Sequence, residues 1–179
     1  MSALSGIVSL DRLAFRFING VWTHPSLDAL MPVITDIHKV PWFIYGVAPV
    51  ALGLWLWKGR ARALRALVVA AIAMGVCDLL SHRVIKPWVA RPRPERAGVG
   101  AVMRVPSGGA MGFPSNHATN VGAAAAVLSV AYPGARFAFW GGAAAVAYRR
   151  VYCGAHYPLD ARAGLALGGL LSWPWALLM

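Results

Sequence analysis

A long apolar segment is the feature that most restricts how this chain can fold. Residues 40–57 form a run of 18 residues without a formal charge, bounded by Lys39 and Lys58. Because a helix of about 20 apolar residues crosses the hydrocarbon core of a bilayer, this run predicts a membrane-spanning helix. Further apolar runs occupy residues 66–85, 118–132, 137–148 and 159–179. The chain is therefore predicted to be an integral membrane protein.

The composition agrees with one helical membrane domain. Hydrophobic residues make up 59% of the 179 residues, and charged residues only 13%. The apolar runs lack the two-residue alternation of bilayer strands, which must also close into a barrel. If residues 26–37 form a short first span, the sequence predicts an all-α polytopic bundle of about six transmembrane helices, with a single domain over residues 1–179.

The amino-terminal segment is amphipathic. The apolar side chains of its helical pattern share one face: Leu10, Leu13, Ala14, Phe17 and Val21. The polar side chains lie largely opposite: Asp11, Arg12, Arg16 and Asn19. A secretory signal peptide is not expected, because no positive region precedes the apolar residues and charged residues interrupt them. The pattern predicts a helix that lies in the membrane interface.

The formal net charge of +11 is best explained by membrane topology. Nucleic acid is not an expected partner, because no soluble basic surface or base-stacking module is evident. Basic residues crowd one short connection between apolar runs: Lys58, Arg60, Arg62 and Arg65. The positive-inside rule places this connection in the cytoplasm, and counting runs places residues 86–117 and 150–158 on the opposite side.

Three short motifs lie on that opposite side. The first is Lys-x6-Arg-Pro from Lys86, the second is Pro-Ser-Asn-His from Pro114, and the third is Arg-x5-His-x3-Asp from Arg150. A phosphoryl group in transfer carries charge on three peripheral oxygens, which cationic donors stabilise. If residues 156–160 are helical, His156 and Asp160 share a face, and the carboxylate can hold one ring nitrogen while the other attacks. The motifs therefore indicate a phosphate site with a nucleophilic histidine.

The three motifs, in this order, resemble the type 2 phosphatidic acid phosphatase (PAP2) superfamily of integral-membrane lipid phosphatases. The resemblance covers roughly residues 78–165. Two positions depart from the family pattern: Asn116 replaces a glycine, and Arg149 replaces the serine that usually precedes the third-motif arginine. Asn tolerates turn and left-handed conformations well, and its side chain could add a contact. Arg149 is either a further phosphate contact or a charge that faces lipid headgroups.

The resemblance implies a role for each motif residue. His156 attacks phosphorus to give a phosphohistidine, Asp160 holds its tautomer, and His117 protonates the departing oxygen. The implied phosphate-binding residues are Lys86, Arg93, Ser115, Asn116 and Arg150. No metal or other cofactor is implied, and the two cysteines, Cys77 and Cys153, form neither a disulfide framework nor a metal site.

Other ionisable residues receive structural interpretations. Asp78, His82 and Arg83 are expected to pair with one another or to reach toward the interface. Arg91, Arg96 and Arg104 are expected to contact substrate or lipid headgroups from the loop between the first two motifs. Arg104 is the residue predicted to bind the second phosphate of a diphosphate substrate.

The predicted activity is metal-independent hydrolysis of a phosphomonoester or pyrophosphate of a membrane lipid, in the bacterial inner membrane with the site facing outward. Undecaprenyl pyrophosphate is the first choice of substrate. The alternatives are a lipid A 1-phosphatase, a phosphatase of phosphatidylglycerol phosphate or phosphatidic acid, and a lipid phosphotransferase. A protein that binds or transports phosphorylated lipid is the alternative without chemistry. No oligomeric state is predicted.

Overall fold

The computed structural model describes residues 3–36, 40–106, 108–177 and 179, and this part of the chain is helical. The long elements are α1 (Ala3–Arg16), α2 (Pro25–Asp36), α3 (Ala48–Leu80), α5 (Asn116–Ala131), α6 (Arg136–Tyr152) and α7 (Pro158–Ala176). The short elements are η1 (Phe17–Val21), η3 (Phe43–Val47), η4 (Ser81–Ile85), α4 (Lys86–Val89), η5 (Pro94–Arg96) and η6 (Pro133–Ala135). The described residues contain no strand beyond an isolated bridge between Pro92 and Met111. The predicted all-α class is confirmed.

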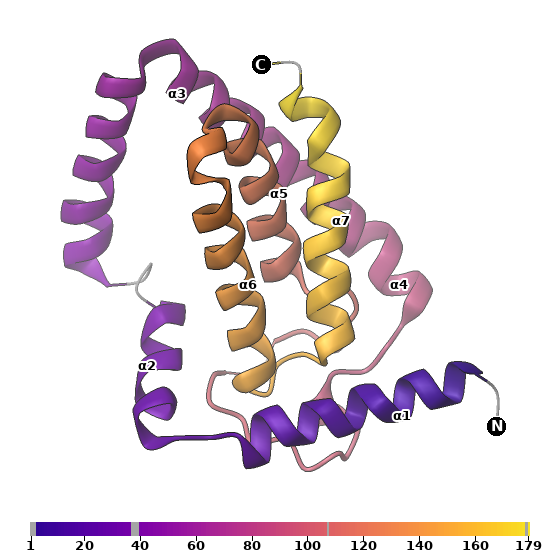
Figure 1. Ribbon diagram of the computed structural model, residues 1–179. Coiled ribbons are helices and arrows are strands. Elements are labelled where there is room, and N and C mark those ends of the chain that lie inside the picture. Colours follow the sequence, from indigo (N-terminus) through magenta and orange to yellow (C-terminus); the bar gives the residue numbers. More distant parts are fainter. Residues whose placement is uncertain (1–2, 37–39, 107, 178) are drawn as a thin grey trace.

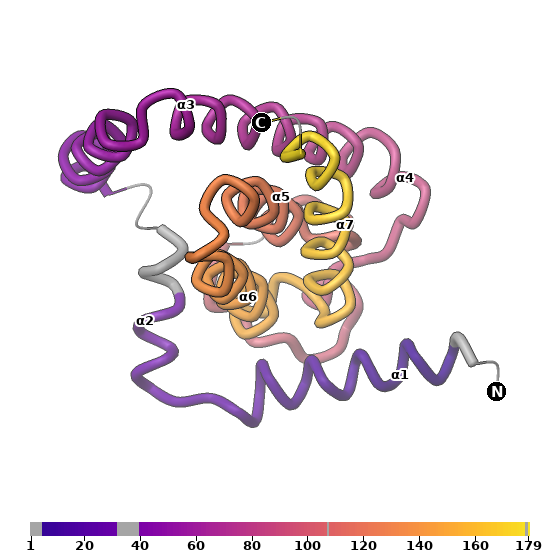
Figure 2. The backbone as a smooth tube through the Cα atoms, turned by 45° about the horizontal axis from the view of Figure 1, so that its top comes forward, coloured from indigo at the N-terminus to yellow at the C-terminus, as the bar shows by residue number. Residues whose placement is uncertain are grey.

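Helices α5, α6 and α7 form the centre of the molecule. Helix α5 makes its most extensive contacts with α7 and also packs against α3 and α6. Figures 1 and 2 show α3 along one side of this group, with α1 lying across the end at which α7 begins. The loop between α4 and α5 runs over the same end (Figure 1). All three sequence motifs therefore meet at one end of the bundle.

The close approach of α5 and α7 requires a glycine. A Cβ atom at Gly168 would overlap the carbonyl oxygen of Thr119 and would lie 2.8 Å from the backbone nitrogen of Ala123. Any side chain at this position would push the helices apart, because backbone atoms cannot move aside as a flexible side chain can. The glycine fixes the spacing of the two helices that carry the second and third motifs.

The predicted spans at residues 40–57 and 66–85 lie largely in one long helix, α3, with a break inside it. Arg60 leaves helical geometry at φ 46° and ψ −129°, and the ribbon turns over at the end of the molecule opposite α1 (Figure 1). In the described part of the chain, one helical stretch, Phe43–Val89, is long and apolar enough to cross a membrane. The count of about six spans stays a prediction.

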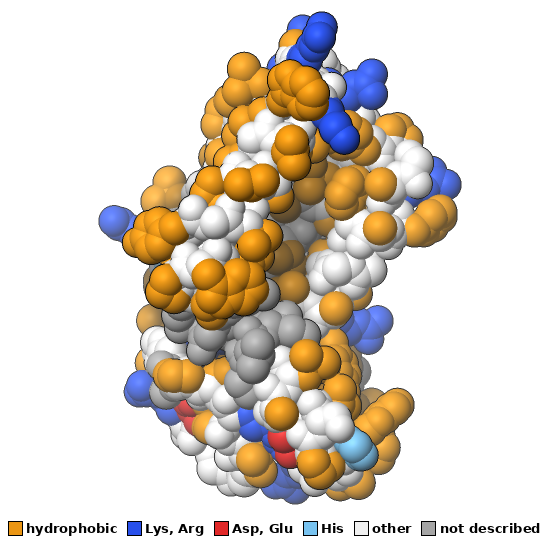
Figure 3. Space-filling view, turned by 90° about the vertical axis from the view of Figure 1, so that its left-hand side faces the viewer, with side chains coloured by type: hydrophobic (Ala, Val, Ile, Leu, Met, Phe, Trp, Pro, Cys, Tyr) orange, Lys and Arg blue, Asp and Glu red, His pale blue; other side chains and the backbone are white. Residues whose placement is uncertain are grey.

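The segment predicted as a short first span is helix α2, which ends at Asp36; residue 37 lies outside the described residues. Its 12 residues extend about 18 Å, which is short of a bilayer core of about 30 Å. The face that includes α2 and the first half of α3 is largely hydrophobic in its middle, with charged side chains nearer both ends (Figure 3). Exposed Val50, Leu54 and Trp57 of α3 contribute to its apolar surface. This distribution suits a chain surrounded by lipid.

Candidate active site

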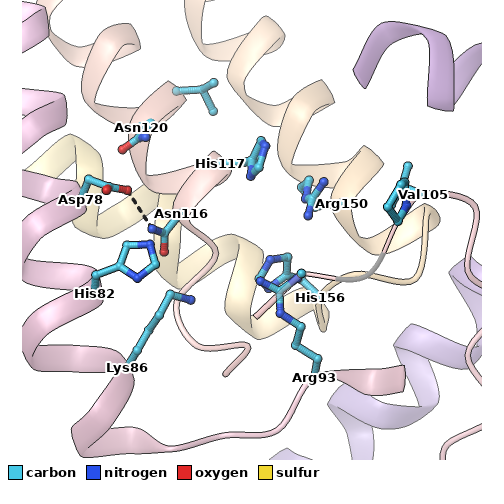
Figure 4. A pocket seen from close by; sticks show the side chains of 13 residues that line it. Asp78, His82, Lys86, Arg93, Val105, Asn116, His117, Asn120, Arg150 and His156 are labelled. Atoms are coloured by element: carbon cyan, nitrogen blue, oxygen red, sulfur yellow. Dashed lines mark hydrogen bonds between the residues drawn. The ribbon is translucent and has the colours of Figure 1, made fainter. Parts of the chain in front are cut away.

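A cavity of about 590 Å³ opens where the three motifs meet. Six residues predicted to act on phosphate line it: Lys86, Arg93, Asn116, His117, Arg150 and His156. Figure 4 shows Arg93, Arg150 and His156 on one side, and Asp78, His82 and Lys86 on the other. The fold therefore brings predicted residues as far apart as Lys86 and His156, which are separated by 70 positions, into one site.

The three cations of the cavity are buried, and backbone carbonyl groups hold two of them. The ammonium of Lys86 donates to the carbonyl oxygen of Pro114 at 2.8 Å, and Nε of Arg93 donates to that of Met111 at 3.3 Å. Arg150 is 7% exposed at the end of α6. Among the described side chains, Nη1 of Arg93 and Nε of Arg150 are buried without a hydrogen-bond partner. The wall is therefore cationic and has donor capacity to spare for an anion.

The second motif forms the amino-terminal end of α5. Ser115 is the N-cap residue, with extended backbone, and its N–H donates to the carbonyl oxygen of Asp160 at 3.0 Å. This bond ties the start of α5 to the start of α7. First-turn N–H groups of a helix have no intrahelical acceptor and favour anions, which suits the predicted phosphate site. The Ser115 side chain is fully buried and does not line the cavity, so its hydroxyl contact with phosphate stays a prediction.

Asn116 makes a contact that the sequence does not indicate. Its amide nitrogen donates to Asp78 on α3 at 2.7 Å (Figure 4). Asn116 is the first residue of α5, and the described non-glycine residues with positive φ are Arg60 and Ala90, so tolerance of a left-handed backbone is not needed here. Asp78 is expected to pair with His82 or Arg83, but its carboxylate accepts a hydrogen bond from Asn116. This bond joins α3 to the start of α5.

The third motif is a turn followed by a helix start. The Arg150 carbonyl oxygen accepts the N–H groups of Ala155 and His156, at 3.0 and 3.2 Å, which keeps the cation and the histidine adjacent. Gly154 permits this turn with φ +85°, a conformation that L side chains rarely adopt. Helix α7 begins at Pro158, where a proline is tolerated, so His156 lies before the helix and not on its face.

The histidine and the carboxylate meet through this helix start. Asp160 is the third residue of α7, and its Oδ2 accepts the N–H of Tyr157 at 3.0 Å. The same oxygen lies 3.7 Å from Nδ1 of His156, slightly beyond hydrogen-bond distance. The expected shared helical face is therefore replaced by a cap, but the pairing of Nδ1 with Asp160 is retained. This geometry leaves Nε2 as the ring nitrogen available for attack.

His156 is 1% exposed, and its surroundings decide its charge. Burial lowers the pKa of His156 to about 4, and the Asp160 carboxylate acts in the opposite direction. The imidazole is therefore neutral at pH 7, which is the state that a nucleophile requires.

Two loop arginines differ from expectation. Arg104 donates to Asp28 at 2.6 Å and to the carbonyl oxygen of Asn19 at 2.9 Å, and it lies over the ring of Tyr152. Arg104 does not line the cavity and its guanidinium joins three elements, so the structure lends no support to its role as a second phosphate ligand, which stays a prediction. Arg91 binds carboxylates, including Asp160, in place of a headgroup.

Three cavity residues with polar side chains lie outside the motifs: Asp78, His82 and Asn120. Their positions on α3, η4 and α5 became evident only once these elements were packed, although Asn120 lies one helical turn after Asn116 and shares its face. Arg149 is 4% exposed and does not line the cavity. Among the described residues, no group of three or more His, Cys, Asp or Glu side chains is arranged to hold a metal ion.

Comparison with known proteins identifies the family. The model of the PAP2 superfamily matches residues 50–179. The lipid A 4'-phosphatase of Porphyromonas gingivalis is 32% identical over 168 residues, 90% of this chain and 70% of that protein. The lipid A 1-phosphatase of Rhizobium etli is 48% identical over 60 residues, 34% of this chain and 26% of that protein. The crystal structure of Aquifex aeolicus LpxE has the same fold, with a TM-score of 0.70 and 22% identity over 95% of this chain and 96% of that one. The chain belongs to the PAP2 superfamily.

Proposed function

We propose that this PAP2 lipid phosphatase removes a phosphate group from lipid A. The family and the lipid A phosphatases among its relatives support this substrate class. The sequence pattern places undecaprenyl pyrophosphate slightly ahead, but the comparisons favour lipid A, which is one of its alternatives. Arg104, the residue predicted to bind a second phosphate, is bound to Asp28 and does not line the cavity, so it lends no support to a diphosphate.

The observation that carries the proposal is the position of His156 among three buried cations. Lys86, Arg93 and Arg150 face the same cavity as the neutral imidazole. Anion binding alone needs only the cations, whereas a desolvated nucleophile beside them serves a reaction at phosphorus. Charge that develops on the phosphoryl oxygens is stabilised by donors already in place, usually the largest contribution to such a reaction.

The reaction proceeds in two displacements. Nε2 of His156 forms a bond to phosphorus as the bond to the lipid oxygen breaks, and His117 gives a proton to that oxygen. Oδ2 of Asp160 accepts a hydrogen bond from Nδ1–H of His156 and stabilises the positive charge of the phosphohistidine. Water, deprotonated by His117, then attacks phosphorus, which releases inorganic phosphate and returns His156 to its neutral form.

The substrate is tested by phosphate release from purified protein in detergent. Lipid A, undecaprenyl pyrophosphate and phosphatidylglycerol phosphate are supplied at equal concentration, and mass spectrometry of the lipid A product identifies the sugar position that loses phosphate. We expect lipid A to have the highest kcat/KM. Transfer of phosphate to a second lipid in place of water would appear as a deficit of inorganic phosphate and would identify a phosphotransferase.

The result for each lipid bears on a separate part of the proposal. Efficient cleavage of another lipid with lipid A untouched overturns the substrate class but leaves the phosphatase. Tight binding of lipid A without release of phosphate from any lipid overturns the enzyme and favours a binding or transport protein.

We propose that the site lies at the outer face of the bacterial inner membrane. The basic residues 58–65 lie at the turn of α3, opposite the end that carries the site (Figure 1). Exposed Ala61 and Ala110 mark the two ends. Each is changed to Cys in a background lacking Cys77 and Cys153, and an impermeant thiol reagent is added to cells with a permeabilised outer membrane. We expect labelling at position 110 and none at 61; the reverse pattern would invert the orientation.

A further inference from the structure

Helix α1 and the following turn η1 bury two polar residues, Asp11 and Asn19, and expose several apolar ones. Asp11, Phe15 and Asn19, in α1 and the following turn η1, are at most 5% exposed and repeat every four residues, so they form one face. Exposed hydrophobic side chains cover much of the rest of the segment: Ile7, Leu10, Leu13, Phe17 and Val21. The sequence predicts that the polar residues lie opposite the apolar ones; of these polar residues, Arg12 and Arg16 are exposed, whereas Asp11 and Asn19 are buried. The polar face is turned toward the protein, at the end of the bundle where the site lies (Figures 1 and 2).

Asp11 joins this helix to the catalytic carboxylate through Arg91. Nη2 of Arg91 donates to Oδ2 of Asp11 at 2.5 Å, and Nη1 donates to Oδ1 of Asp160 at 2.7 Å. The second oxygen of Asp11 accepts the N–H of Leu159 at 2.8 Å, next to Asp160 in the first turn of α7. One guanidinium therefore bridges two carboxylates, and one of those carboxylates also binds the backbone beside the other.

Aromatic rings hold the same arrangement from a second side. The Arg91 guanidinium lies 4.2 Å from the centre of the Tyr157 ring, and Phe15 of α1 packs edge-on against that ring at 5.3 Å. Tyr157 stands between His156 and the first residue of α7. The contacts of α1 thus reach both the turn that carries the nucleophile and the residue that orients it.

The two carboxylate oxygens of Asp160 have different partners. Oδ1 is taken by Arg91, and Oδ2 serves the Tyr157 N–H and faces Nδ1 of His156. The side chain of Asp160 is fully buried, where an unpaired carboxylate would be strongly destabilised, so Arg91 both neutralises it and fixes its rotation. Asp11 in turn holds the guanidinium in the plane that this bond requires.

We propose that Asp11 and Arg91 are positioning residues that set the geometry of the His156–Asp160 pair, so that the docked helix α1 is part of the catalytic apparatus. The proposal rests on the proposed role of His156 as nucleophile. It assigns the loop residue Arg91 and a residue of the amino-terminal helix to the reaction, although neither lines the cavity.

The variant Asp11→Asn separates positioning from folding. Its carbonyl oxygen can still accept the Leu159 N–H, but its amide group cannot accept a bond from Arg91. We expect kcat, and the single-turnover rate of phosphoenzyme formation, to fall by about 10- to 100-fold, as is typical when a partner that orients a reactive ligand is lost. KM should change little, because substrate contacts are intact. Asp11→Glu should recover part of kcat by restoring a carboxylate.

Arg16→Gln is the matched control, because it changes one charge at an exposed position of the same helix. Its kcat should equal that of the unmodified protein. Arg91→Lys provides a second variant, since an ammonium keeps the charge but lacks the fork that bridges two carboxylates. The double variant of Asp11→Asn and Arg91→Lys should lose no more rate than the worse single variant, because both interrupt the same connection.

The outcomes are decisive in both directions. A normal kcat in folded Asp11→Asn, or in Arg91→Lys if the first variant does not fold, overturns the proposal. A fall in kcat that Asp11→Glu does not relieve, or a change confined to KM, also overturns it. Rates are measured on any phosphate ester that the unmodified protein hydrolyses. A missing phosphohistidine would then refute His156 as the nucleophile, whereas the role of Asp11 is decided separately by the rates of its variants.

Discussion

Replacement of His156 with alanine should abolish turnover, whereas excess EDTA should leave turnover intact. The substitution removes the proposed nucleophile, so the loss should exceed the factor of about 100 to 10,000 that a general acid or base contributes. The insensitivity to EDTA follows from the proposed chemistry, in which Lys86, Arg93 and Arg150 provide the charge that a metal ion provides elsewhere. Phosphate release and trapping of a labelled phosphoenzyme measure the two effects.

An exposed histidine that does not line the cavity provides the control. His24 lies before α2, and His24→Ala should retain normal phosphate release. Substantial turnover in His156→Ala would refute the phosphohistidine. Strong inhibition by EDTA, with activity restored by added magnesium, would show that cationic side chains are not sufficient.

Replacement of Gly168 with alanine should strongly destabilise the fold. The new methyl group would overlap the Thr119 carbonyl oxygen, and relief requires α5 and α7 to separate. Overpacking of this kind typically costs about 1–3 kcal/mol, and a clash with rigid backbone belongs at the upper end of that range or beyond. Because the two helices start at the second and third motifs, activity should fall together with the thermal unfolding temperature.

The matched control for this change is Gly142→Ala in α6, where the added methyl group meets no atom within 4 Å. Its stability should be unchanged or slightly higher, because alanine favours a helix more than glycine does. Equal unfolding temperatures for the two variants would contradict the close packing of α5 against α7.

The sequence predicts which residues meet in the cavity better than it predicts the contacts between distant segments. The spacing of the motifs identifies Arg93, Arg150, His117 and His156, and these side chains converge on one cavity because each lies at or near the start or end of a helix. Apolar runs similarly predict the positions of α5 and α7. Such features depend on residues close together in the chain, which a pattern can reveal.

Contacts between distant segments could not be predicted in this way. Arg91 and Arg104 look equivalent in sequence, yet the first binds Asp160 and the second binds Asp28. Their partners depend on how α1 and α2 dock against the bundle. Asp11 gives no signal of its own, because a charged residue on an amphipathic helix is ordinarily expected to face water. The position of His156 also differs from the local expectation, since a helix that starts at Pro158 cannot carry it.

The bond between Ser115 and Asp160 has a consequence for how such an enzyme can change. It locks the supports of His117 and His156 into one unit, in which a shift of either helix would disturb both of the proposed displacement steps. Asp78 and His82 come from the other side of the cavity, on α3 and η4. Asp78 holds Asn116 at the start of α5, so its substitution would disturb the support of His117, whereas substitution of His82 can reshape that side of the cavity and leave this bond in place. Engineering of new substrate scope should therefore begin at His82 on η4 and leave the α5–α7 unit and its bond to Asp78 untouched.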